Sequence, residues 1–250
     1  MKRIFQSIAL LGLFTGTAAF LAYEPKVILN QPDDKGFAVV ELFTSEGCSS
    51  CPPADKILEQ LEQQHLDGQL YVLAFHVDYW DHQGWKDRFS DKTYSLRQQQ
   101  YASWLNVRTV YTPQLIVNGS SEHIGSDASA VSNVINHQLQ QPASRSLKLE
   151  GKVDGKRLTV QHNLNSVTGS NLVVTLVQRQ ARSRVKAGEN AGSDLAHVQI
   201  VRAMKQVPPE TGKDVVLSLP SDYDKQQWEV IGFVQDRQTG KITDAARVSL

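Results

Sequence analysis

The sequence predicts an α/β domain followed by an all-β domain. Between residues 37 and 77 an apolar strand, an amphipathic helix and a second apolar strand follow one another, which is the order of a parallel strand pair with a crossover helix. After residue 142 the pattern changes to short apolar or alternating segments separated by polar turns, which is typical of a β-sandwich. The only two cysteines of the 250-residue chain, Cys48 and Cys51, lie between the first strand and the helix.

Residues 1–22 have the composition of an export signal peptide. Two basic residues come first, an uncharged and mainly apolar stretch follows, and small residues precede a cleavage site after Ala19. An uncleaved anchor is the alternative, because residues 4–22 are just long enough to span a bilayer. We therefore expect a periplasmic or secreted protein of a Gram-negative-type envelope, or one anchored in the inner membrane if the leader is retained.

The charge pattern argues against nucleic acid as a partner. The chain has 26 basic and 26 acidic residues, and neither a basic patch nor a run of like charge stands out. Contact with a membrane is expected only if the leader is retained.

Outside the cytoplasm disulfides can persist. An isolated pair of cysteines there is more easily explained by disulfide exchange than by a structural bridge.

The elements of the α/β domain, residues 37–141, follow from periodicity and turn residues. Residues 23–36 contain two prolines, two aspartates and a glycine and are expected to form a linker before it. Two prolines after Cys51 suit a helix start, and Asp127 is expected to cap the last helix. The expected elements are strands at 37–44, 69–77, 112–119 and around Ile124, and helices at 54–61, 91–105 and 128–139.

The all-β domain is expected over residues 142–250, with the boundary marked by Pro142 and Ser144. The polar segment Gly188–Gly192 is interpreted as a turn held by local hydrogen bonds of Asn190. The expected strands are 147–153, 158–164, 172–177, 215–219 and 228–235.

The position of the two cysteines favours redox chemistry. A thiol at a helix N-terminus faces unpaired N–H groups and the positive end of the helix dipole, and both favour the thiolate. Cys48, at the open end, is the expected nucleophile, and Cys51 is placed to resolve a mixed disulfide. A structural bridge and half of a metal site are the alternatives. A bridge across so short a loop stabilises little, and a closed zinc site needs four ligands.

The order of these elements resembles the thioredoxin fold over residues 37–140. The resemblance implies that Cys48 is the attacking thiol and Cys51 the resolving thiol. It also implies that the Thr112–Pro113 peptide bond is cis and lies against the cysteines, where the backbone before the proline pairs with a bound substrate. Thr112, Pro113 and Tyr111 are therefore the expected substrate-binding residues.

A narrower resemblance covers nearly the whole chain after the leader. The run from Val40 to Asp55 contains Glu46-Gly47-Cys48-Ser49-Ser50-Cys51-Pro52-Pro53, and it is followed by His76-Val77-Asp78-Tyr79-Trp80-Asp81 and Tyr111-Thr112-Pro113-Gln114. These segments resemble an exported bacterial thioredoxin-like family known as domain of unknown function 1223. The resemblance implies a fold and almost no biochemistry.

Two features depart from the pattern of a plain thioredoxin. Many thioredoxins keep a buried carboxylate on the first strand, and the candidate here, Glu41, lies one residue further from the cysteines. It is either a buried group that tunes them or an edge-strand residue facing solvent. The longer interval between the cysteines and Pro113 contains His76, Asp78 and Trp80, which form either a substrate platform or a hydrophobic cluster under a loop.

The sequence thus predicts a thiol–disulfide oxidoreductase that acts on thiol or disulfide proteins of the cell envelope. Its redox group would be the Cys48–Cys51 disulfide, with no other cofactor. One alternative is a Cu(I) metallochaperone that uses both cysteines with His76, His82 or His123, since thiolates and imidazole suit Cu(I). The other is an envelope interaction module with an inert disulfide. Redox direction, partner, oligomeric state and the role of the all-β domain stay open.

Overall fold

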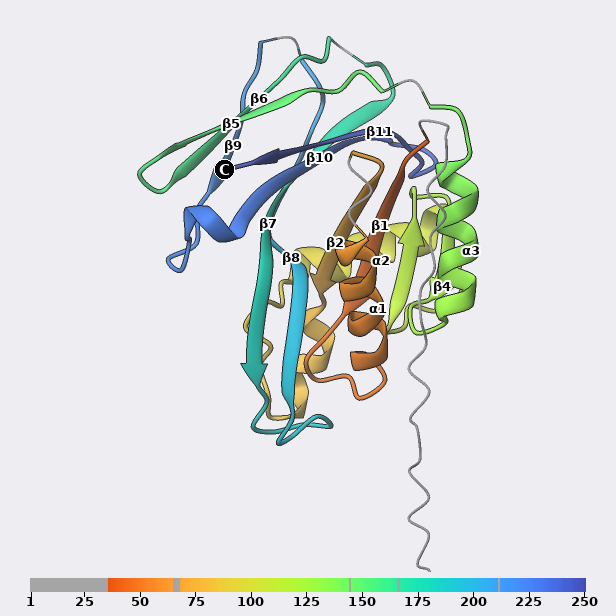
Figure 1. The fold of residues 1–250 in the computed structure, drawn as a ribbon, viewed down its shortest axis with the longest axis vertical. Coiled ribbons are helices and arrows are strands. Elements are labelled where there is room, and N and C mark those ends of the chain that lie inside the picture. Colours follow the sequence, from red (N-terminus) through yellow and green to blue (C-terminus); the bar gives the residue numbers. More distant parts are fainter. Residues whose placement is uncertain (1–35, 65–67, 144, 166, 211) are drawn as a thin grey trace, which may run out of the picture.

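A computed structural model describes residues 36–64, 68–143, 145–165, 167–210 and 212–250 (Figure 1). The predicted leader, 1–22, and the predicted linker up to residue 35 lie outside these residues. Over the part of the chain that is described, no helix has the length and apolar character needed to cross a membrane.

An eight-stranded mixed sheet runs through the molecule in the order β11-β10-β7-β8-β2-β1-β3-β4 (Figure 1). The pairs β1/β2 and β2/β8 are parallel, and the other neighbours are antiparallel. The strands are β1 (Ala38–Thr44), β2 (Leu70–His76), β3 (Gln114–Val117), β4 (Ser121–Ile124), β7 (Ser170–Arg184), β8 (Asp194–Val207), β10 (Trp228–Asp236) and β11 (Ile242–Ser249).

The central strand β1 is buried along its whole length, because helices or strands cover both of its faces. Alternate residues of β1 enter two different cores. Leu42 packs with α1 (Pro52–Gln63) and α3 (Ala128–Leu139), whereas Phe43 packs with α2 (Lys92–Trp104). The helices therefore cover opposite faces of the sheet, and Asp127 caps α3 as predicted by accepting a hydrogen bond from the backbone N–H of Ala130.

A second, three-stranded sheet lies over one end of the large sheet (Figure 1). It has the order β5-β6-β9 and consists of β5 (Leu149–Asp154), β6 (Arg157–His162) and β9 (Val215–Ser218). Its apolar face packs on β7 and β10 around the fully buried Trp228, which follows the short 3₁₀ helix η2 (Lys225–Gln227).

The second half of the chain is not a sandwich of its own, which corrects the predicted architecture. Four of its strands, β7, β8, β10 and β11, extend the sheet begun by the first half, and only the three-stranded sheet forms a new layer. β8 and β11 were not predicted as strands. β8 carries buried polar residues such as His197 and Gln199, so its apolar period is interrupted, and local periodicity does not specify which sheet edge a strand joins.

Candidate functional site

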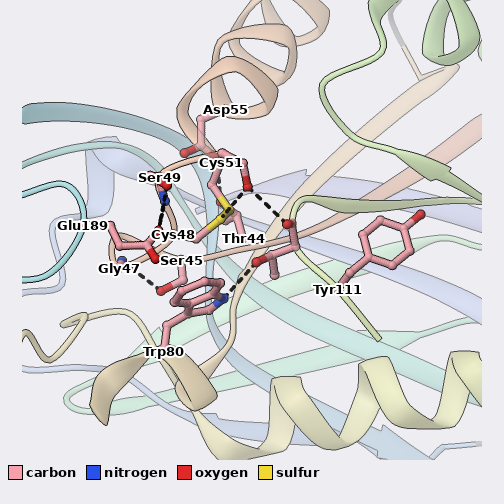
Figure 2. Close-up of a disulfide and its surroundings, with 12 residues drawn as sticks. Thr44, Ser45, Gly47, Cys48, Ser49, Cys51, Asp55, Trp80, Tyr111 and Glu189 are labelled. Carbon is pink, nitrogen blue, oxygen red and sulfur yellow. Dashed lines mark hydrogen bonds between the residues drawn. A yellow bond between two sulfur atoms is a disulfide. The ribbon is translucent and has the colours of Figure 1, made fainter. Parts of the chain in front are cut away.

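The two cysteines form a disulfide at the start of α1, with their Cα atoms 5.4 Å apart (Figure 2). Cys51 is the N-cap residue, and its carbonyl accepts the N–H groups of Ala54 and Asp55 at 2.9 and 3.1 Å. Both cysteine side chains are fully buried, whereas Ser49 and Ser50 between them are exposed. A partner can therefore reach the serines directly but reaches the sulfur atoms only after a local movement.

Pro113 lies beside the disulfide at the start of β3. The Thr112–Pro113 peptide bond is cis, as the resemblance to thioredoxin implied. Ser50 links this turn to the cysteines, because its Oγ atom lies 3.4 Å from the Thr112 carbonyl oxygen and 3.4 Å from Cys48 Sγ. Gly125 allows the close packing, since a Cβ atom there would lie 2.8 Å from a Leu42 methyl group and 3.3 Å from Pro113 Cβ.

The segment after β2 supplies one wall of the site. Trp80, in the 3₁₀ helix η1 (Asp78–Gln83), donates a hydrogen bond from Nε1 to Thr112 Oγ1 at 2.8 Å (Figure 2). Its Cβ atom also lies 3.1 Å from the place where a Cβ on Gly47 would be, so a side chain at position 47 would push this wall outward. Asp78 is bonded to Ser95 of α2 and holds the start of η1.

The loop between β7 and β8, residues 185–193, covers the cysteine turn from the other side. Glu189 Oε2 accepts the N–H and the hydroxyl of Ser49 at 3.0 and 2.6 Å. Asn190, which is buried, donates from Nδ2 to the carbonyls of Glu46 and Cys48, both at 2.9 Å. The prediction of a turn held by local bonds of Asn190 missed these contacts, because no short-range pattern indicates a partner 142 residues away.

A cluster of buried ionisable side chains lies behind the disulfide. Thr44 Oγ1 donates to Asp55 Oδ1 at 3.0 Å, and His76 Nδ1 lies 2.6 Å from Asp87 Oδ2. The ring of His197, from β8, stands 4.9 Å from that of His76. The nitrogen atoms of His197 face Glu46 Oε1 at 3.4 Å and Asp55 Oδ2 at 3.9 Å. Of this group, only His76 was predicted as a site residue from the sequence.

Glu41 lies on the opposite face of β1 and is not part of this cluster. It accepts two hydrogen bonds from Arg97 of α2, at 2.6 and 2.9 Å, and one from the hydroxyl of Tyr101. Arg97 also donates to Gln235 of β10 at 3.2 Å. The solvent-facing alternative for Glu41 is wrong, because the side chain is fully buried. Its partners join β1, α2 and β10.

The other predicted site residues are less close to the sulfur atoms. Tyr111 points away from the disulfide and donates its hydroxyl to Glu122 (Figure 2). Its burial and that carboxylate raise its pKa. His82 is exposed and its Nδ1 atom lies 2.8 Å from the Tyr79 carbonyl oxygen. His76 is buried and its Nδ1 atom is bonded to Asp87. In the described ranges of the chain, no three His, Cys, Asp or Glu side chains are arranged to hold a metal ion.

Comparison with known proteins identifies the family. The model of a family described as "Protein of unknown function (DUF1223)" matches residues 39–235. The chain belongs to the DUF1223 family. A search of the curated proteins gave no match for this DUF1223 chain.

Solved structures similar to the DUF1223 chain share its overall fold. A crystal structure of a protein from Agrobacterium tumefaciens has 26% sequence identity and a TM-score of 0.65, and the match covers 87% of this chain and 96% of that one. HBP35 of Porphyromonas gingivalis has 15% identity and a TM-score of 0.57, with 87% and 76% of the two chains covered. The second likeness shows the fold alone.

The buried cluster of this DUF1223 protein carries charges of both signs. Burial opposes ionisation of Asp87, but the contact with His76 and two backbone N–H groups lower its pKa to about 2. Burial likewise opposes the charged form of His76, yet Asp87 raises its pKa. The pKa of Glu46 is lowered against the effect of burial by His197 and Trp85, whereas burial raises the pKa of Asp55. These shifts favour the ionised form of the His76–Asp87 pair.

This pair predicts a pH-dependent stability. Because the pKa of His76 is above 6.5 in the folded DUF1223 protein, its contribution is fully present below pH 6.5 and is lost as the pH rises through the folded pKa. We expect the free energy of unfolding to fall more steeply as the pH rises above about 6.5 in the wild type than in Asp87→Asn, where the main group that raises the pKa of His76 is gone and only Asp55 and Glu46 oppose the effect of burial. Urea unfolding at several pH values measures this, and equal slopes would contradict it.

Proposed function

We propose that this DUF1223 protein is a thiol–disulfide oxidoreductase that acts through Cys48 and Cys51 on a thioredoxin-like framework. The observation that carries the proposal is the pairing of a disulfide at the start of α1 with Thr112–Pro113 on the neighbouring turn. The parallel pair β1/β2 with α1 between its strands, the hairpin β3/β4 and the final helix α3 support the framework.

The proposed reaction transfers two electrons between the protein and a substrate disulfide. In the reducing direction the Cys48 thiolate attacks one sulfur of the substrate, so that the substrate S–S bond breaks and one substrate thiolate leaves. Cys51, after losing its proton, then attacks Cys48 Sγ, which restores the protein disulfide and releases the second substrate thiolate. The oxidising direction is the reverse sequence, in which two substrate thiols lose the electrons.

Substrate docking is proposed at Thr112. The contact of Ser50 Oγ with the Thr112 carbonyl oxygen is long, at 3.4 Å, and both residues are accessible. A substrate backbone placed along Tyr111 and Thr112 can replace this contact and bring its sulfur toward Cys48. The proposed partners are thiol or disulfide proteins of the cell envelope, where disulfide exchange has substrates.

The test is the equilibrium reduction potential of the Cys48/Cys51 pair, titrated against glutathione with an alkylation readout. We expect a reversible two-electron transition in the range of known oxidoreductases, from roughly −120 to −270 mV. The Cys48→Ser/Cys51→Ser double variant is the control for alkylation background. A pair that stays oxidised far below this range is a structural bridge. The copper content is measured on the same purified protein, and stoichiometric copper would indicate a metal carrier. A structural bridge and a metal carrier would each overturn the proposal.

A further inference from the structure

An exposed carboxylate, that of Glu189, lies at the mouth of the cysteine turn. Glu189 accepts both polar hydrogens of Ser49, the residue that follows Cys48, at 3.0 Å from the backbone nitrogen and 2.6 Å from the hydroxyl (Figure 2). These bonds to Ser49 lower the pKa of Glu189, so the side chain is negatively charged at neutral pH. A full negative charge therefore stands next to the expected nucleophile.

The fold holds this carboxylate in place. The neighbouring Asn190 is buried and ties its loop to the carbonyls on either side of Gly47. At the other end, the N–H of Gly192 donates to the carbonyl of Val185 at 2.9 Å and closes the loop on itself. Gly188, with φ of +78°, fits against Gln83 and Trp85 of the opposite wall. The backbone of Glu189 is thus held in place by the contacts of its loop, and the bonds to Ser49 then hold its carboxylate.

The start of α1 offers the Cys48 thiolate fewer N–H groups than the position of the cysteines predicted, so little compensates this charge. Pro52 and Pro53 occupy the first two helical positions and have no N–H, so two of the donors that usually face an anion at a helix start are missing. The N–H of Ser49 is already bonded to Glu189. Behind the disulfide the charges of His76 and Asp87 offset each other at 2.6 Å. Glu46, Asp55 and His197 complete the titratable groups of that buried cluster.

We propose that Glu189 makes the Cys48/Cys51 pair a reductant and disfavours anionic disulfide substrates. This inference rests on the proposed function and gives it a direction and a substrate class. A negative charge beside Cys48 disfavours its thiolate, which exists only in the reduced protein. The reduced dithiol then passes its two electrons to a substrate disulfide more readily, forming the protein disulfide and two substrate thiols. The same charge repels an anionic substrate and attracts a cationic one.

The test compares the wild type with Glu189→Gln, which keeps an oxygen that can accept from Ser49 but removes the charge. Glu150→Gln is the matched control, because Glu150 is an exposed carboxylate on β5 in the second sheet. Three quantities are measured on each protein. They are the pKa of the Cys48 thiol in the reduced state, the equilibrium constant with glutathione, and the rates of oxidation by cystamine, a cation, and by glutathione disulfide, an anion.

We expect Glu189→Gln to lower the pKa of the Cys48 thiol and to shift the equilibrium with glutathione toward the reduced protein by up to about tenfold, which is about 30 mV. The ratio of the cystamine rate to the glutathione disulfide rate should fall several-fold. Both effects should shrink when the salt concentration rises from about 0.01 M to about 1 M, because exposed charges are screened. A merely structural role of Glu189 would not depend on salt in this way.

The inference is overturned if Glu189→Gln, like Glu150→Gln, has the same thiol pKa and the same rate ratio as the wild type. In that case, exchange with glutathione would still support the proposed oxidoreductase. Absence of exchange in all three proteins would instead overturn the proposed function. The thiol pKa of the reduced proteins can be measured in either case, so the two failures are distinguishable.

Discussion

Replacement of Arg97 by alanine should lower the free energy of unfolding by about 3–5 kcal/mol, because it leaves the carboxylate of Glu41 buried without its cation. The two hydrogen bonds from Arg97 to Glu41 and the one to Gln235 cross three elements, β1, α2 and β10. Their loss therefore weakens the joint between the first and second halves of the sheet. Urea unfolding at pH 7, followed by circular dichroism, measures the change.

Two further variants separate the charge from the packing. Arg157→Ala removes an exposed arginine of β6 and should change the free energy of unfolding by less than about 0.5 kcal/mol. Replacing both members of the pair by methionine should recover most of the loss, since apolar residues of similar volume often substitute for a buried ion pair. If Arg97→Ala stays within about 1 kcal/mol of the wild type, the Glu41–Arg97 pair is not a structural joint.

Replacement of Cys51 by serine should stop turnover and trap the substrate on Cys48. The variant retains the proposed attacking thiol but has no group to break the mixed disulfide, so we expect at least about a 10³-fold loss of steady-state activity. A covalent adduct stable to alkylation should accumulate, and intact-protein mass spectrometry would detect one substrate per chain. The adduct should disappear on treatment with dithiothreitol.

The matched variant Cys48→Ser distinguishes the two thiols. It should lose activity to the same extent but form no lasting adduct, because Cys51 is the N-cap residue of α1 and lies behind the turn that Ser49 and Ser50 expose. Adducts of equal yield in both variants would show that the two sulfur atoms are equally accessible. Adducts in Cys48→Ser alone would reverse the roles of nucleophile and resolving group.

Local pattern was enough to predict the elements around the cysteines. The strand before Cys48, the helix that begins at Pro52, the cap at Asp127 and the short strand ending at Ile124 are all observed. Each depends on residues within a few positions of one another, such as an alternation of apolar side chains or a proline in a first turn. The cis Thr112–Pro113 bond was implied only by the resemblance to thioredoxin and not by local pattern.

Contacts between distant segments account for what could not be predicted. An apolar run containing Glu41 indicated a carboxylate that would be costly to bury, but not that Arg97, 56 residues later, neutralises it. β8 carries the buried His197, which interrupts its apolar period, and it joins the open edge of β2 through Ile200, which no local pattern specifies. Glu189 and Asn190 have the composition of an ordinary turn. Only the fold brings them to the cysteines.

The loop that covers the disulfide has a consequence for how the protein is made. A chain is synthesised from its N-terminus, so Cys48 and Cys51 emerge about 140 residues before Glu189 and Asn190. Until then the two thiols have neither their lid nor the strand that closes the edge of β2. Newly made chains therefore pass through a stage in which oxidants can react with the two thiols. Completion of the β7–β8 hairpin is the event that ends this exposure.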